Sequence, residues 1–143
     1  MQLAQTGSRW ILRFDGFFLG LAGTVAMIAE TVGHFLGLGP LAETRGSPHT
    51  IGGFEAHGLA VLIAILLFHG ATTADRKLWH VVGLTTHLFL ASANLLYWSS
   101  FVFHGLLPVG IVSTVLHIIL VVAHAACLWR LAPNKSLEHM RGR

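Results

Sequence analysis

The chain alternates four long apolar stretches with short polar connections. The apolar stretches cover residues 10–38, 52–72, 79–103 and 109–129, and the connections between them are 39–51, 73–78 and 104–108. Each stretch approaches the ~20 residues that a helix needs to cross a bilayer core. The pattern predicts an all-α integral membrane protein with a single membrane domain over residues 1–143, folded as a four-transmembrane-helix bundle in up-down-up-down order. Residues 1–9 are expected to be a short polar segment at the membrane interface.

The third stretch carries polar side chains at regular intervals. His80, His87 and Asn94 are seven residues apart, so they share one face of a helix. Hydrocarbon does not solvate such groups, and the stripe therefore needs partners on other helices. The first stretch offers small residues that allow helices to approach closely, namely Gly16, Gly20, Gly23, Gly33 and Gly37.

The composition supports a membrane protein. Hydrophobic residues make up 54% of the chain and charged residues only 10%, whereas ordinary soluble domains carry about 25% charged residues. The single cysteine, Cys127, excludes an internal disulfide and a paired-cysteine metal site. No phosphate-binding glycine loop, nucleophile elbow or HExxH zinc motif occurs.

The distribution of basic residues predicts an orientation. Of the nine Lys and Arg residues, all except Arg45 fall on one side of a four-span arrangement. Positive charge accumulates on the cytoplasmic side of membrane proteins, so both termini and the basic tail 130–143 are expected in the cytoplasm, with the protein in a bacterial inner membrane. Because the formal charge of +3 gathers at segment ends, we interpret it as a determinant of topology, and we expect no nucleic-acid partner.

Helical rise places two histidines at matched depth near the membrane centre. At about 1.5 Å per residue, His87 and His117 lie close to the midplane of the third and fourth spans. A haem iron held between two helices needs two imidazoles at similar depth. His80 and His124 lie seven residues along the same faces and form a second, inner pair. The arrangement is similar to that of four-helix b-type cytochromes of membranes, which implies haem b as cofactor.

A second polar group lies toward the outer face. Glu30 and His34 are four residues apart on one helix face, and His57 reaches a similar depth. His117, nearer the membrane centre, is expected at the inner end of this group. Imidazole and carboxylate are the usual ligands of Zn, Fe or Mn, so these four residues form a candidate transition-metal set. Glu55 is two positions from His57 and points to the opposite side of a regular helix, so only one of the two is expected to face this site. A plain Glu30–His34 ion pair is the structural alternative.

Three functional hypotheses follow. In the first, the bundle binds haem b or a His-ligated metal and transfers electrons between a quinone and an outside partner. Its candidate cofactor ligands are His87, His117, His57 and His124. In the second, the chain is a non-enzymatic accessory or structural subunit of a larger membrane complex, or a homo-oligomer, and it binds a pigment or lipid.

The third hypothesis is a proton or small-solute path along the polar stripe of the third span. The structural alternative to all three is hydrogen bonding between helices, which would satisfy the same histidines without a cofactor. His80 lies near the inner interface, where we expect its side chain to reach the lipid headgroups.

Overall fold

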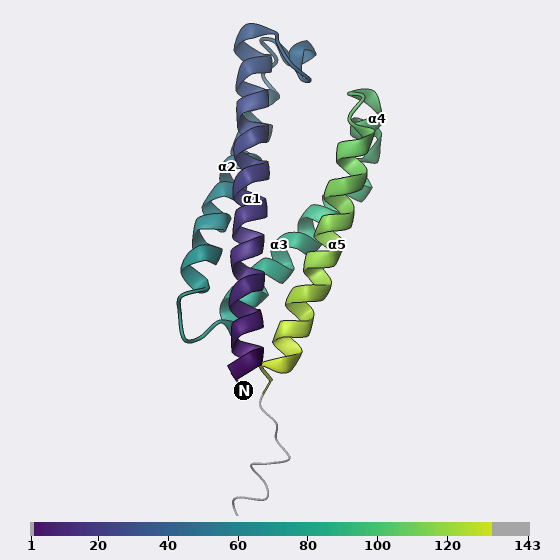
Figure 1. The fold of residues 1–143 in the computed structure, drawn as a ribbon. Coiled ribbons are helices and arrows are strands. Elements are labelled where there is room, and N and C mark those ends of the chain that lie inside the picture. Colours follow the sequence, from purple (N-terminus) through teal and green to yellow (C-terminus); the bar gives the residue numbers. More distant parts are fainter. Residues whose placement is uncertain (1, 133–143) are drawn as a thin grey trace, which may run out of the picture.

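The computed structural model describes residues 2–132, and it is all-helical over this range (Figure 1). Four long helices dominate: α1 (Gln2–Leu36), α2 (Thr50–Gly70), α3 (Lys77–Leu96) and α5 (Leu107–Arg130). A 3-10 turn, η1 (Ala42–Thr44), lies in the first connection, and the short helix α4 (Trp98–Phe103) precedes α5. Most of the basic tail predicted over 130–143 lies outside the described residues.

Three of the helices are long and apolar enough to cross a membrane. They are α1 (over Thr6–Leu36), α2 and α5 (over Leu107–Leu131). The 20-residue helix α3 has the length of a span, about 30 Å at 1.5 Å per residue. It carries the polar stripe and is not among the three helices that are both long and apolar enough.

Two of the predicted segments differ from the structure at their ends. Helix α1 begins at Gln2, so the expected interfacial segment is largely helical. The stretch predicted as one span over 79–103 is divided at Tyr97 into α3 and α4. Helix α1 ends at Leu36 because Gly37 adopts a positive φ of 64°, with its N–H bonded to the carbonyl of Gly33 at 2.9 Å.

The long helices form two antiparallel hairpins, α1–α2 and α3–α5 (Figure 1). The hairpins pack on each other around a buried cluster of polar side chains and separate toward the end that carries η1 and α4. There, His104 Nδ1 and Glu43 Oε1 are hydrogen-bonded at 2.5 Å and join the two connections. The N-terminal end of α1 and the C-terminal end of α5 lie at the opposite end of the molecule.

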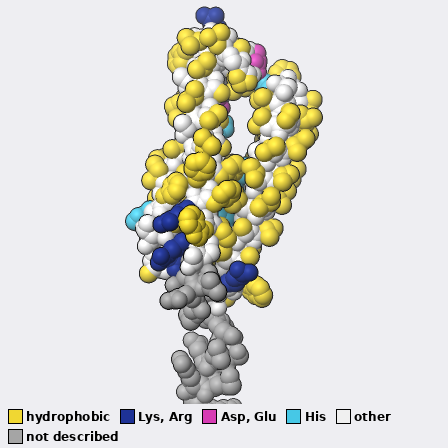
Figure 2. Space-filling model, in the orientation of Figure 1, with side chains coloured by type: hydrophobic (Ala, Val, Ile, Leu, Met, Phe, Trp, Pro, Cys, Tyr) yellow, Lys and Arg dark blue, Asp and Glu magenta, His cyan; other side chains and the backbone are white. Residues whose placement is uncertain are grey.

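Glycines allow α1 and α2 to approach closely, as the sequence predicts. A β-carbon on Gly16 would lie 3.0 Å from the backbone oxygen of Ala64, and one on Gly23 would lie 2.8 Å from the oxygen of His57. Apolar side chains cover most of the outer surface, and Lys and Arg gather near the end that carries the N-terminus (Figure 2). A surface of this kind is compatible with contact with lipid.

Candidate metal centre in the bundle core

Six buried polar side chains from three helices form one hydrogen-bonded cluster, which we call the core histidine cluster. Helix α1 supplies Ser8 and Asp15, α3 supplies His80 and His87, and α5 supplies His117 and His124. Asp15, His80, His87 and His124 are each 0% exposed. Buried polar groups at membrane depth are costly unless they are paired, so the cluster accounts for how these three helices meet.

Asp15 is the centre of this cluster. Its Oδ1 is 2.7 Å from Nε2 of His87, and its Oδ2 is 2.8 Å from Nε2 of His124. Each carboxylate oxygen therefore binds an imidazole from a different helix. Asp15 thereby joins the α1–α2 hairpin to the α3–α5 hairpin.

The cluster extends from Asp15 along two arms. In one arm, Nδ1 of His87 lies 2.9 Å from Nδ1 of His117. In the other, Nδ1 of His124 lies 2.8 Å from Nδ1 of His80, and Nε2 of His80 lies 2.6 Å from the hydroxyl of Ser8. The result is a continuous chain of five hydrogen bonds.

One set of tautomers satisfies every bond of this chain. If Asp15 is ionised, its oxygens accept protons from Nε2–H of His87 and of His124. The Nδ1 atoms of these two rings then accept from Nδ1–H of the outer histidines, His117 and His80. Nε2 of His80 accepts in turn from the Ser8 hydroxyl. All four imidazoles are neutral in this arrangement, which avoids unpaired buried charge on the rings.

Asp15, His87 and His124 could hold a metal ion. Their ligand atoms lie within 4.8 Å of one another, and all three residues are buried. Ligand atoms around a tetrahedral metal lie about 3.3–3.5 Å apart at bond lengths of about 2.0–2.2 Å. The Asp15 oxygens are 2.7 and 2.8 Å from the two Nε2 atoms, so a metal would require these side chains to separate by about half an ångström.

The surroundings fix the positions of the imidazoles. The ring of Phe18 lies 6.3 Å from the ring of His87 and 5.7 Å from that of His117, measured between centroids. Gly83 faces the ring of His124, where any side chain would collide with it. Leu12 and Leu19, which are buried on the same face of α1 as Asp15, exclude water from this side.

The predicted pairings of α3 with α5 are present. His87 contacts His117, and His80 contacts His124, as the matched depths indicate. The expectation that His80 reaches the headgroups is wrong, because Ser8 and His124 hold it in the core. Asn94, the third member of the polar stripe, also faces α5, where its amide donates to Ser113 and Thr114, each at 3.1 Å.

The structure does not bring the four predicted ligands of the outer metal site together. Glu30 and His57 are bonded at 3.1 Å, whereas His34 bonds to Thr50 at 3.2 Å. His117 belongs to the core histidine cluster and lies apart from these residues. Glu55 is exposed while His57 faces Glu30, so one of these two residues faces the outer group, as predicted.

Asp15 and Ser8 are the members of the cluster that were not predicted from the sequence. Ser8, Leu12, Asp15 and Leu19 follow one another at intervals of three or four residues, and all four are buried. This spacing marks one face of a helix, and it was the available indication that Asp15 points into the core. No protein-family model matches this chain, and comparisons with curated proteins and with solved structures gave no match.

Proposed function

We propose that this protein is a membrane-embedded metal protein that binds one transition-metal ion through Asp15, His87 and His124. The observation that carries the proposal is the convergence of three buried ligand side chains from three helices. A carboxylate with two imidazoles is a donor set that suits Fe(II) and Zn(II), and it leaves coordination positions open. Iron would give the centre the redox role considered above, whereas zinc would not.

The two outer histidines suit the role of supports for the metal ligands. A metal-binding imidazole normally donates its second N–H to an acceptor, which fixes its tautomer and orientation. With Nε2 of His87 and His124 directed to the metal, their Nδ1–H groups would donate to His117 and His80 across the observed contacts. His80 would then donate through Nε2–H to Ser8. Metal binding would thus reverse the tautomer of every histidine in the cluster without releasing a proton.

Haem b between His87 and His117 fits this packing less well. An iron ligated by both rings would hold their nitrogens about 4 Å apart, at about 2 Å per metal–nitrogen bond. The two Nδ1 atoms are hydrogen-bonded at 2.9 Å, and the ring centroids are 5.0 Å apart. A porphyrin would have to separate α3 from α5 along their contact. We therefore favour a single ion bound at Asp15 over haem.

Metal analysis of the full chain in lipid nanodiscs tests the proposal. The protein would be purified without chelators, equilibrated separately with Fe(II) and Zn(II), and assayed for bound metal. We expect one ion per chain, and a loss of binding in His87→Ala and His124→Ala. His57→Ala, which lies outside the cluster, serves as the matched control. The proposal fails if the wild type binds no metal stoichiometrically or if both core variants bind as well as the control.

A redox role requires a further measurement. Optical titration of the iron-loaded protein with dithionite and ferricyanide would show whether the metal changes oxidation state reversibly. A quinone or quinol added in the same lipid would test the proposed electron partner. A protein that retains only Zn(II) would leave the metal-binding proposal intact and contradict the electron-transfer function.

Proton transfer through the cluster is the second candidate. It is favoured by the continuous hydrogen-bonded chain, which extends beyond the metal ligands to Ser8 and His117. With Asp15 ionised, both arms direct protons toward its carboxylate, so passage through the chain requires one arm to reverse its tautomers. Proton flux into proteoliposomes that falls in Asp15→Asn, compared with Asn94→Leu, would support this function. Equal flux in the two variants would remove it.

We further propose a four-span orientation with both ends in the cytoplasm. The distribution of basic residues supports this orientation. Five of them lie near the same end of the molecule, namely Arg9, Arg13, Arg76, Lys77 and Arg130, while Arg45 lies at the other end, in the connection between α1 and α2. Labelling of cysteines introduced at Ser47 and Asp75 with an impermeant reagent would test it. We expect Ser47→Cys to react from outside intact cells, and Asp75→Cys to react only after lysis. Purification in mild detergent would show whether the chain belongs to a larger complex.

A further inference from the structure

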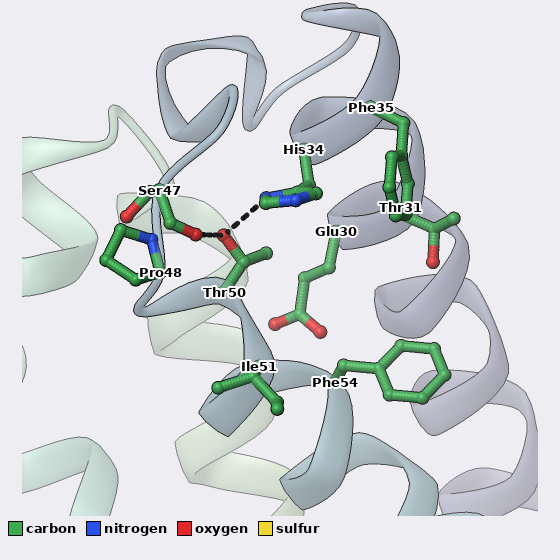
Figure 3. Close-up of a pocket in the computed structure, with 9 residues that line it drawn as sticks. All are labelled: Glu30, Thr31, His34, Phe35, Ser47, Pro48, Thr50, Ile51 and Phe54. Atoms are coloured by element: carbon green, nitrogen blue, oxygen red, sulfur yellow. Dashed lines mark hydrogen bonds between the residues drawn. The ribbon is translucent and has the colours of Figure 1, made fainter.

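A pocket separate from the core histidine cluster lies between the end of α1 and the beginning of α2 (Figure 3). Its volume is about 470 Å³. The lining is largely apolar and includes Phe35, Ile51 and Phe54, and its polar side chains are Glu30, Thr31, His34, Ser47 and Thr50. Glu30 lies about 9 Å from the end of α1, because it is six residues before Leu36 and each residue adds about 1.5 Å.

Glu30 brings an unpaired acceptor to this pocket. The residue is only 8% exposed. Its Oε1 bonds to Nδ1 of His57 at 3.1 Å, but its Oε2 is buried without a hydrogen-bond partner among the described residues. A buried carboxylate oxygen without a donor is unfavourable, so a ligand that supplies one would gain affinity from this contact.

Gly53 makes room for this carboxylate. A β-carbon built on Gly53 would overlap Oε1 of Glu30. Gly52, the preceding residue, has open space at the equivalent position. The close approach of α2 to the carboxylate therefore depends on a glycine at position 53.

His34 supplies a second acceptor. The Thr50 hydroxyl donates to the carbonyl of Ser47 at 2.9 Å, so its oxygen accepts a proton from Nδ1–H of His34 at 3.2 Å. In a neutral imidazole, this leaves Nε2 of His34 as an acceptor. Glu30 and His34 thus each present an acceptor that a donor on the ligand would satisfy, while the aromatic side chains of the lining favour a flat apolar ligand.

We propose that this pocket binds a lipid-soluble phenol, a class that includes quinols, through a hydrogen bond from its hydroxyl to Glu30 Oε2. A neutral donor suits the site because His57 already pairs with the other carboxylate oxygen. A lipid-soluble ligand suits it because Phe35 and Ile51 are largely exposed on an outer surface that is itself apolar. The site does not depend on a metal in the core.

A matched pair of probes tests the hydrogen bond. The full chain in lipid nanodiscs would be titrated with 2-naphthol and with 2-methoxynaphthalene, with empty nanodiscs as the reference for partition into lipid. The two probes have the same ring system, but only naphthol donates. We expect 2-naphthol to saturate one site per chain with about tenfold higher affinity than the ether. Equal affinities of the two probes, or no saturable binding, would overturn the proposal.

Variants of Glu30 locate the contact. Glu30→Met keeps the length of the side chain and removes the acceptor, so the preference for naphthol over the ether should disappear. Gly53→Ala should weaken naphthol binding by displacing the carboxylate. Glu55→Met, on the exposed side of α2, and Gly52→Ala are the matched controls and should bind as the wild type does. Retained preference in a folded Glu30→Met protein, checked by circular dichroism and thermal unfolding, would refute the assignment.

Discussion

Gly83 on α3 lies directly against the imidazole of His124 on α5. A β-carbon at Gly83 would be 2.5 Å from Cε1 and from Nε2 of that ring, closer than carbon atoms approach in proteins. Nε2 is also the atom that bonds to Asp15 at 2.8 Å. The absence of a side chain at one position of α3 thus determines where a proposed metal ligand on another helix lies.

Gly83→Ala should therefore weaken metal binding without removing a ligand. The added methyl group must displace the His124 ring, and overpacking of this kind costs about 1–3 kcal/mol of stability. We expect metal affinity to fall about 10–100-fold, as for other changes that misorient a ligand. Competition with a chromophoric chelator would measure it. Gly58→Ala, where the nearest atom to the new carbon is 3.8 Å away, is the control, and similar affinities for the two variants would contradict the prediction.

Asp15→Asn and Asp15→Leu should differ in stability. Asparagine keeps one acceptor and adds a donor, so one arm of the cluster can reverse its tautomers and every bond remains paired. Leucine leaves the Nε2 atoms of His87 and His124 without partners, at a cost of about 1–3 kcal/mol for each buried group. Thermal unfolding in nanodiscs would compare the two variants, and both should lose the metal. A leucine variant as stable as the asparagine variant would show that Asp15 is not central to the packing.

Two glycines on α1 should respond differently to the same substitution. A β-carbon on Gly20 would make an ordinary 3.4 Å contact with the methyl of Ala64, whereas one on Gly23 would be 2.8 Å from the backbone oxygen of His57. The backbone of α2 cannot turn aside as a side chain can. We expect Gly20→Ala to be neutral and Gly23→Ala to lose about 1–3 kcal/mol. Unfolding in sodium dodecyl sulfate would rank the two, and equal losses would argue against close α1–α2 packing at Gly23.

The contact between Glu43 and His104 should respond to acid. A hydrogen bond from its own backbone and a second with His104 lower the pKa of Glu43 from its ordinary value of 4.5. Because the folded pKa is depressed, the stabilisation is present above pH 4.5 and is lost as the pH falls through the lower, folded value.

Carbon-13 NMR of the Glu43 carboxyl group would follow this titration. In His104→Ala the midpoint should rise toward 4.5 without reaching it, because the backbone hydrogen bond is the larger cause. A midpoint that does not move in this variant would show that the two connections are not joined in the membrane.

Local patterns predicted most of the helices because each depends on its own stretch of sequence. Apolar runs of sufficient length marked α1, α2 and α5. The seven-residue spacing on α3 showed that His80, His87 and Asn94 face one neighbour, and all three bond to α5. The break at Tyr97 was not predicted, since no glycine or proline marks it between residues 84 and 104.

The amino-acid sequence by itself determined that the chain is helical, that its surface is apolar, and that histidines on α3 and α5 lie at matched depth. These properties follow from composition and helical periodicity. Only the tertiary structure decided that Asp15 bonds to His87 and His124. It also decided that Glu30 pairs with His57 and not with His34. The reason is that depth along a helix follows from residue number, whereas the direction of a side chain around the bundle follows from which helices pack together. Asp15 is a candidate metal ligand because α1 meets the α3–α5 hairpin on the face that carries it.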